Sequence, residues 1–514
     1  MFMTKRRRGT AVVLVLLGLA ALWAIFEHIH GKGVLRAYKA ELTAKGEKLK
    51  VEDLIPPSAA EADLAAAHLT QAAWQLSQNG PVMAPIMRFV APGKAMVGWK
   101  QPDIRDGYGT NRWEELATQL QDNRKALAGI REALMGSRLS WNLDYKQGHG
   151  ILLPHLAKLK QCAQWLSAAI LNDLHNGDLE EARADLKSLL SLAGGLRDEK
   201  LVICQLVGIA MAAIAYGPTW EALQADGWTD AQLATLQTQW ESLELAAAME
   251  KSIEMERAMG EELFDRLRRS SDERKQFLDL ASMGGTSGPP QRAAPRALED
   301  LPKFALALGR RTIDSVSSFG REILWRWFWS YEDERRCLQE AQLTMNELRQ
   351  ATQKHAFGQG PIDGKERWFD RQQTPTEKYF VSASREEGWK RCILKVRRME
   401  TQRELLLTAI ALKRYGLRYK KTAPNLNALV PEFLARPPAD WMDGQPLRYR
   451  VNHDGSFALY SVNEDGKDDG GDATPTRDSP THNFADGRDM VWPLPATEAE
   501  VAEVRARAAG KNRR

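Results

Sequence analysis

The strongest constraint in this sequence is a run of 17 residues without a charge, from Thr10 to Phe26. A helix rises about 1.5 Å per residue, so the run spans about 26 Å, close to the thickness of a bilayer core. Four cations, Lys5 to Arg8, precede it. By the positive-inside rule the N-terminus stays in the cytoplasm and the rest is exported. The sequence therefore predicts a cytoplasmic basic tail at 1–9, a transmembrane helix at 10–26 and a single-pass inner-membrane protein with a periplasmic bulk.

A cleaved signal peptide is the alternative interpretation of this run. The run is longer than the apolar core of most signal peptides, and no good Ala-x-Ala cleavage site follows it. The nearest candidate is Gly18-Leu19-Ala20. Both interpretations export the bulk of the chain, and the anchor is favoured. No other segment offers an apolar run of comparable length, so we expect a single span.

The charge balance argues against nucleic acid as a partner. The chain has 71 basic and 67 acidic residues, a net charge of +4, which gives no bulk attraction for phosphate backbones. The expected partners are the lipid bilayer and proteins of the cell envelope. Four cysteines occur without a CxxC pair. Their apolar neighbours predict buried thiols, and the sequence leaves any disulfide pairing open. These cysteines are Cys162, Cys204, Cys337 and Cys392.

Helical periodicity dominates residues 33–281, which we interpret as an α-helical domain. Capping boxes at Ser58–Glu61 and Thr229–Gln232 mark two helix starts. Apolar residues at i, i+3, i+4 and i+7 and short polar connections favour antiparallel helices in an array. The expected helices cover 62–76, 151–174, 179–196, 200–216 and 233–249.

A flexible linker is predicted at 282–300, where Gly, Pro, Ser and Ala predominate. Residues 301–395 form a helical, aromatic-rich region, and a capped helix is expected from about 386 to 414. The aromatic cluster Trp325–Trp329 contains three tryptophans and a phenylalanine. It permits two interpretations, core packing or a second contact with the membrane interface. The charged residues around it favour the core.

The pattern changes to α+β in residues 396–495. Leu447, Tyr449 and Val451 alternate with arginines, and a return strand follows at 457–461. An Asp-Gly turn at 454–455 joins them into a β-hairpin. Residues 496–514 are expected to form a short helix and a basic tail. The predicted fold class is mainly α: an N-terminal transmembrane helix, an α-helical ectodomain, and a small α+β C-terminal module with a long helix and a β-hairpin.

The order of motifs from about 401 to 492 resembles the periplasmic domain of the major pseudopilin of type II secretion systems. A long helix precedes a Leu-rich turn, Leu426–Pro431, and then a phrase Pro437-Pro438-Ala439-Asp440-Trp441-Met442-Asp443-Gly444 that leads into the first strand. The second strand ends in Leu459-Tyr460-Ser461-Val462-Asn463-Glu464-Asp465-Gly466, and the segment closes with Asp486–Trp492. In overall organisation the chain also resembles single-span envelope proteins of planctomycete- and verrucomicrobia-like bacteria.

The resemblance implies a calcium site in the loop that follows the second strand. Matched by position, its ligands are Asp465, Asp486 and Asp489, with the Val462 carbonyl as a further one. Two more acids of the loop, Asp468 and Asp469, are candidate ligands. Closely spaced carboxylates suit Ca²⁺, which takes six to eight oxygen ligands. From spacing alone, a solvated acidic loop is an equal alternative.

Catalytic signatures are absent from the sequence: it contains no HExxH, GxSxG or Walker A motif. We therefore predict a membrane-anchored, non-enzymatic scaffold or interaction protein with a calcium-binding, pseudopilin-like module. The alternative is a periplasmic hydrolase or lyase with its site in the helical domain, which requires a pocket of converging titratable groups. A polymerising pilus subunit is a third hypothesis. The chain lacks the prepilin signature, because Thr10 rather than Phe follows Gly9.

Overall fold

The computed structural model describes residues 2–57, 60–82, 113–136, 138–283, 325–357, 380–453, 455–474 and 487–493. The described part is mainly helical with one small sheet, as predicted. It divides into two compact units. Unit 1 combines Met1–Leu54, Glu254–Leu343 and Lys365–Lys390, and unit 2 contains the remaining residues. The units thus join stretches that the sequence analysis assigned to different regions. Three long helices, α10 (Leu245–Arg269), α13 (Ser330–Lys354) and α14 (Phe380–Tyr419), contribute residues to both units.

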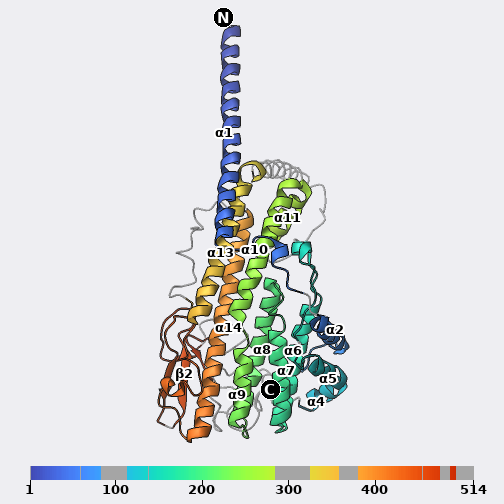
Figure 1. Ribbon diagram of the computed structural model, residues 1–514, viewed down its shortest axis with the longest axis vertical. Coiled ribbons are helices and arrows are strands. Elements are labelled where there is room, and N and C mark those ends of the chain that lie inside the picture. Colours follow the sequence, from blue (N-terminus) through green and yellow to red (C-terminus); the bar gives the residue numbers. More distant parts are fainter. Residues whose placement is uncertain are drawn as a thin grey trace, which may run out of the picture. The chain divides into compact units, whose positions relative to one another are not determined.

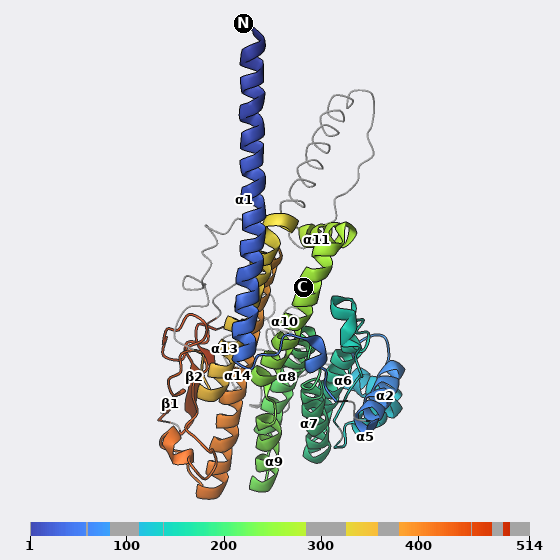
Figure 2. The same ribbon diagram turned by 45° about the horizontal axis from the view of Figure 1, so that its top comes forward.

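Unit 1 is built around the N-terminal helix α1 (Phe2–Ala44), drawn in blue in Figures 1 and 2. It also contains η1 (Val51–Asp53), most of α10 (Leu245–Arg269), α11 (Ser271–Met283), the π-helical turn η5 (Trp325–Trp329), and the first parts of α13 (Ser330–Lys354) and α14 (Phe380–Tyr419). A buried cluster from α10, η5, α13 and α14 forms an apolar core. Lys39 of α1 binds the buried Glu334 of α13 at 2.5 Å, which fixes α1 against this core.

The aromatic cluster is divided between core and surface. Trp325 is 1% exposed and packs in the unit 1 core, whereas Trp327 is 53% exposed. The core interpretation is therefore confirmed for Trp325 and wrong for Trp327. All four cysteines are buried thiols, as expected.

The helical part of unit 2 is an array in which α6 (His155–His175), α7 (Leu179–Gly194) and α8 (Val202–Gln224) pack against one another (Figure 1). A tight turn joins α6 to α7, where Gly177 takes a φ of +79° and Asp178 caps α7 by accepting the Glu181 N–H. Around these helices lie α2 (Ala60–Gln75), α4 (Trp113–Asp122), α5 (Arg124–Ala133), η3 (Tyr145–Gly150) and α9 (Asp230–Glu241).

Most of the expected helices are confirmed, with errors at two boundaries, the first of which is that α8 runs to Gln224 and not to 216. The predicted capping box is present, since Thr229 and Gln232 bond reciprocally at the start of α9. The helix expected to run to 249 ends at Glu241, however, and α10 begins at Leu245. In the first turn of α10 the backbone N–H of Ala246 donates to the Glu400 carboxylate of α14 at 3.2 Å, a contact that local sequence does not encode.

One described helix, α8, is long and apolar enough to cross a bilayer by composition. The expectation that no second run compares with 10–26 is thus wrong, because the segment from Leu201 to Trp220 also carries no charge. Two thirds (67%) of the most apolar window of α8 is buried within the protein, which is the behaviour of a core helix. Most side chains of the N-terminal run lie outside the described residues, so its assignment as a span stays a prediction.

The C-terminal part of unit 2 contains η6 (Leu426–Leu429) and a three-stranded antiparallel sheet in the order β1-β2-β3. β1 (Arg448–Val451) pairs with β2 (Phe457–Ser461), with Tyr449 opposite Leu459, so the predicted hairpin is confirmed. A short third strand, β3 (Met490–Val491), was not predicted. The expected linker beyond 283, the turn residue Asp454, the Ser58–Ala59 helix start and the final helix and tail lie outside the described residues.

This sheet module is packed against the helical array of its own unit. The indole N–H of Trp220 in α8 donates to the Pro493 carbonyl at 2.9 Å. Gln237 of α9 donates to the Phe433 carbonyl at 2.8 Å, and Arg414 of α14 binds Asp230 at 2.7 Å. The module and the array therefore share an interface, and experiments on the module are best made on the full chain.

Candidate functional site

A tight turn between residues 439 and 446 directs one carboxylate into the protein. The backbone N–H of Asp440 donates to the Gln445 carbonyl at 2.7 Å, and that of Gly444 returns to the Asp440 carbonyl at 2.8 Å. Gly444 has a φ of +76°, a left-handed conformation that glycine adopts without strain. As a result Asp440 has a solvent exposure of 0%.

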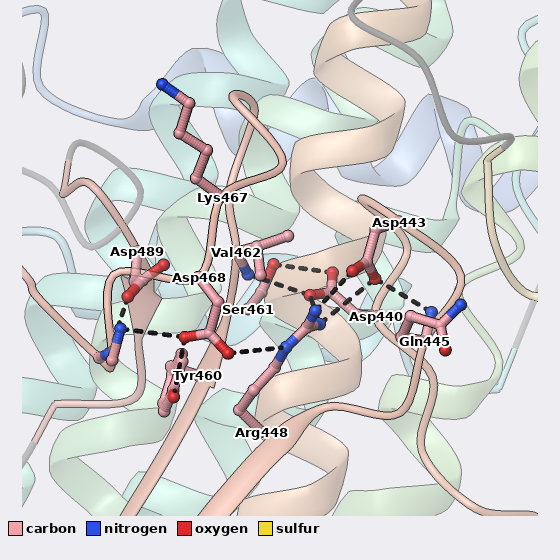
Figure 3. Close-up of polar contacts among 12 residues, drawn as sticks. Asp440, Asp443, Gln445, Arg448, Tyr460, Ser461, Val462, Lys467, Asp468 and Asp489 are labelled. Atoms are coloured by element: carbon pink, nitrogen blue, oxygen red, sulfur yellow. Dashed lines mark hydrogen bonds and ion pairs between the residues drawn. The ribbon is translucent and has the colours of Figure 1, made fainter.

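Asp440 connects this turn to the end of β2. Its carboxylate accepts hydrogen bonds from the Ser461 hydroxyl at 2.7 Å and the Val462 N–H at 3.0 Å (Figure 3), and from the Met442 N–H at 2.9 Å. Burial raises the pKa of Asp440, and these three hydrogen bonds oppose that shift. A buried carboxylate without a counter-charge is costly, so the site needs a cation.

Arg448 at the start of β1 supplies that cation. Its guanidinium lies 2.7 Å from Asp440, 2.5 Å from Asp443 and 3.7 Å from Asp468, so three carboxylates surround it (Figure 3). Burial works against ionisation of Asp443, but the Arg448 and Gln445 hydrogen bonds outweigh it and hold the pKa of Asp443 below its usual value. We call Arg448 and these three acids the arginine–aspartate cluster.

Asp489, just before β3, organises the loop that follows β2. Its buried carboxylate accepts the backbone N–H groups of Gly471 at 2.7 Å, Asp472 at 3.1 Å and Asp469 at 3.4 Å. Burial raises the pKa of Asp489, and these N–H groups oppose that rise. Gly471 has a φ of +84°, and a Cβ there would come within 3.2 Å of the Tyr460 ring, so the loop needs glycine at this position to wrap around Asp489.

The predicted calcium ligands do not converge in the described residues. Val462, whose carbonyl was the expected ligand, is buried, and Asp465 is exposed and accepts the N–H of Lys467 at 3.1 Å. Asp468 accepts the Tyr460 hydroxyl at 3.1 Å and faces Arg448. Asp469 is exposed, and Asp486 lies outside the described residues. Within the described ranges, no group of three metal-ligating side chains occurs.

The described acids are therefore a poor fit to a calcium ion. Asp489 already accepts three backbone N–H groups, and the Arg448 guanidinium beside Asp468 repels a second cation at this place. The calcium site implied by the resemblance stays a prediction.

The calcium prediction can be tested by melting the full chain with calcium and with a chelator such as EGTA. Because Arg448 and backbone amides already neutralise the described acids, we expect the same melting temperature in both conditions. The Asp465→Ala variant is also expected to melt at the same temperature with calcium and with the chelator, because Asp465 is exposed. A calcium-dependent rise in melting temperature that Asp465→Ala abolishes would contradict this expectation and establish the metal site.

Sequence reasoning did not assign roles to Asp440 and Arg448, although both lie in the phrase that carries the resemblance. The available signal was an acid, Asp440, placed between the apolar residues Ala439 and Trp441 and followed eight positions later by a strand arginine. An acid and an arginine at this spacing are as compatible with an ion pair on the protein surface as with a buried one. Only the fold brings the turn and the strand ends together.

An enzymatic site in the helical region would need a pocket of titratable groups. A cavity of about 460 Å³ in unit 2 lies among the α9–α10 junction, the end of α13, α14 and residues 434–441. Its buried acids are paired, since Glu400 binds Arg403 at 2.6 Å and Glu404 binds Arg436 at 3.0 Å. Burial, reinforced by Arg436, lowers the pKa of His355 at the rim. Acids already neutralised by arginines are typical of structural ion pairs rather than of acid–base catalysts.

Comparison of the chain with known family models, with curated proteins and with solved structures gives no match. The resemblance to the major pseudopilin therefore stays a prediction that depends on the motif order alone.

Proposed function

We propose that the chain is a single-span membrane protein of the cell envelope that acts as a non-enzymatic scaffold. Residues 10–26 anchor it in the inner membrane, and the bulk that follows presents helical surfaces and the C-terminal module to protein partners in the periplasm. For the alternative, a hydrolase or lyase, the cavity beside Glu400 and Glu404 in the described part of the chain offers acids that are already paired with arginines.

The observation that carries this proposal is the continuity of α1. A single helix runs from Phe2 to Ala44 and includes the whole uncharged run. Where its side chains are described at the end of this run, they are exposed: Leu22 to 65%, Ile25 to 57% and Phe26 to 63%. Apolar side chains that unit 1 does not cover favour a surrounding apolar phase, and a helix satisfies its own backbone hydrogen bonds there.

Membrane fractionation tests the anchor directly. We expect the full chain to remain in the membrane pellet after extraction at alkaline pH with carbonate, and to dissolve only in detergent, as integral proteins do. Recovery of the intact chain in the carbonate supernatant would contradict the proposal.

A further inference from the structure

A stripe of exposed apolar residues continues beyond the uncharged run on one face of α1. Leu22, Ile25, Phe26 and Ile29 stand at i, i+3, i+4 and i+7 and are each at least 57% exposed, which places them on one side of the helix. Trp327 of η5, 53% exposed, lies next to this segment. His28 makes the connection, because its Nδ1 lies 2.9 Å from the Trp327 carbonyl and its ring 5.4 Å from the indole.

The exposed position of Trp327 is fixed by the packing of its neighbours. Two residues earlier, the buried indole of Trp325 donates to Asp333 at 2.8 Å. Asp333 also accepts the backbone N–H groups of Ser382 at 2.9 Å and Val381 at 3.3 Å. These bonds hold the π-helical turn in place, so the exposure of Trp327 is a property of the folded turn and not of a loose chain end.

The chemistry of this surface matches the boundary between hydrocarbon and headgroups. Tryptophan is enriched there because its ring is apolar and its N–H needs a polar partner. Exposed cations flank the stripe: Lys32 and Arg36 on α1, and Arg326 beside Trp327. Arg36 is seven residues beyond Ile29, about 10 Å further along the helix, which suits side chains that reach lipid phosphates.

We propose that η5 rests in the headgroup layer of the exported-side leaflet beside α1. Trp327 lies at the boundary, and Lys32, Arg36 and Arg326 contact lipid phosphates. This inference rests on the proposed anchor and adds a second contact to it. Unit 1 then touches the bilayer through two elements that are nearly 300 residues apart in sequence (the residue separation of His28 and Trp327 is 299).

Brominated lipids, which quench tryptophan fluorescence on contact, test the second contact. The full chain is reconstituted in phosphatidylcholine vesicles with and without bromine near the top of the acyl chains. The quenched intensity is compared for the unmodified chain, Trp327→Phe and the control Trp74→Phe. Trp74 is 55% exposed, nearly the same as Trp327, but it lies on α2 of unit 2 beneath Lys158.

We expect Trp327→Phe to lose a measurable part of the quenched intensity, because Trp327 is the exposed tryptophan of η5, whereas Trp325 is buried and Trp329 is half-buried. Trp74→Phe is expected to leave it unchanged. Vesicle flotation separates the two claims. Chains that float with the vesicles but lose no quenched intensity on Trp327→Phe would overturn the headgroup contact and leave the anchor intact. Chains that do not float would overturn the anchor, and the contact with it.

Discussion

Replacing Arg448 by methionine is expected to lower the free energy of unfolding of unit 2 by about 3–5 kcal/mol, the usual cost of removing one partner of a buried ion pair. Methionine keeps the length of the side chain but removes its charge. Asp440, fully buried, then loses its cation at 2.7 Å, and Asp443 loses the contact at 2.5 Å. Denaturant unfolding of the full chain, followed by the C-terminal tryptophans, measures the loss.

The same change two residues further along the strand is the matched control. Arg450 is exposed and donates to the Gly470 carbonyl at 3.2 Å, so Arg450→Met should change stability by no more than about 0.5 kcal/mol. Asp440→Asn made in the Arg448→Met background should restore part of the loss, because it removes the unpaired charge. Equal losses for Arg448→Met and Arg450→Met would contradict the role given to the arginine–aspartate cluster.

Local signals in the sequence were sufficient for many of the helices and for the hairpin. The Thr229–Gln232 capping box, the polar turn at Asn176–Asp178 and the alternation around Tyr449 each depend on residues within one or two turns of each other, and each is confirmed. β3 was missed because two residues, Met490 and Val491, are too few to show a period.

Tertiary context decided the features that sequence patterns left undetermined. Helix α8 and the run at 10–26 have similar composition, and only packing against α6 and α7 identifies α8 as a core helix. Trp325 and Trp327 lie two positions apart, yet one is buried and the other exposed, because the π-helical turn sets their directions. The sequence alone shows neither that α8 is a core helix nor that Trp325 is buried while Trp327 is exposed.

The calcium site expected in the loop after the second strand stays a prediction, and the contacts that the structure shows in this loop were not predicted. The acids after the second strand were expected to bind calcium, whereas in the structure Asp489 accepts the Gly471 N–H and Asp468 accepts the Tyr460 hydroxyl. Whether a carboxylate binds a metal, a backbone N–H or an arginine depends on which donors the fold brings near it. Here the donors are the 469–472 backbone and Arg448.

Two arginines placed in the uncharged run are expected to prevent membrane insertion. Leu16→Arg with Leu19→Arg flanks the centre of residues 10–26. Each arginine near the centre of a span costs about 2.5–3.5 kcal/mol, so the pair costs about 5–7 kcal/mol. The double variant should therefore appear in the soluble fraction, or be degraded, whereas the unmodified chain stays with the membrane. Leu64→Arg is the control, because Leu64 is 58% exposed on α2 and its substitution should leave localisation unchanged.

The export of the bulk of the chain is tested most directly by alkaline phosphatase fused after Arg514 in a bacterial host. This reporter is active only where its disulfides form, outside the cytoplasm. We expect high phosphatase activity for the unmodified chain and for Leu64→Arg, and a near-complete loss for the Leu16→Arg, Leu19→Arg variant. The result that would contradict export of the bulk of the chain has two parts. The phosphatase fused to the unmodified chain would be inactive, and a reporter that fluoresces only in the cytoplasm would be fluorescent at the same position.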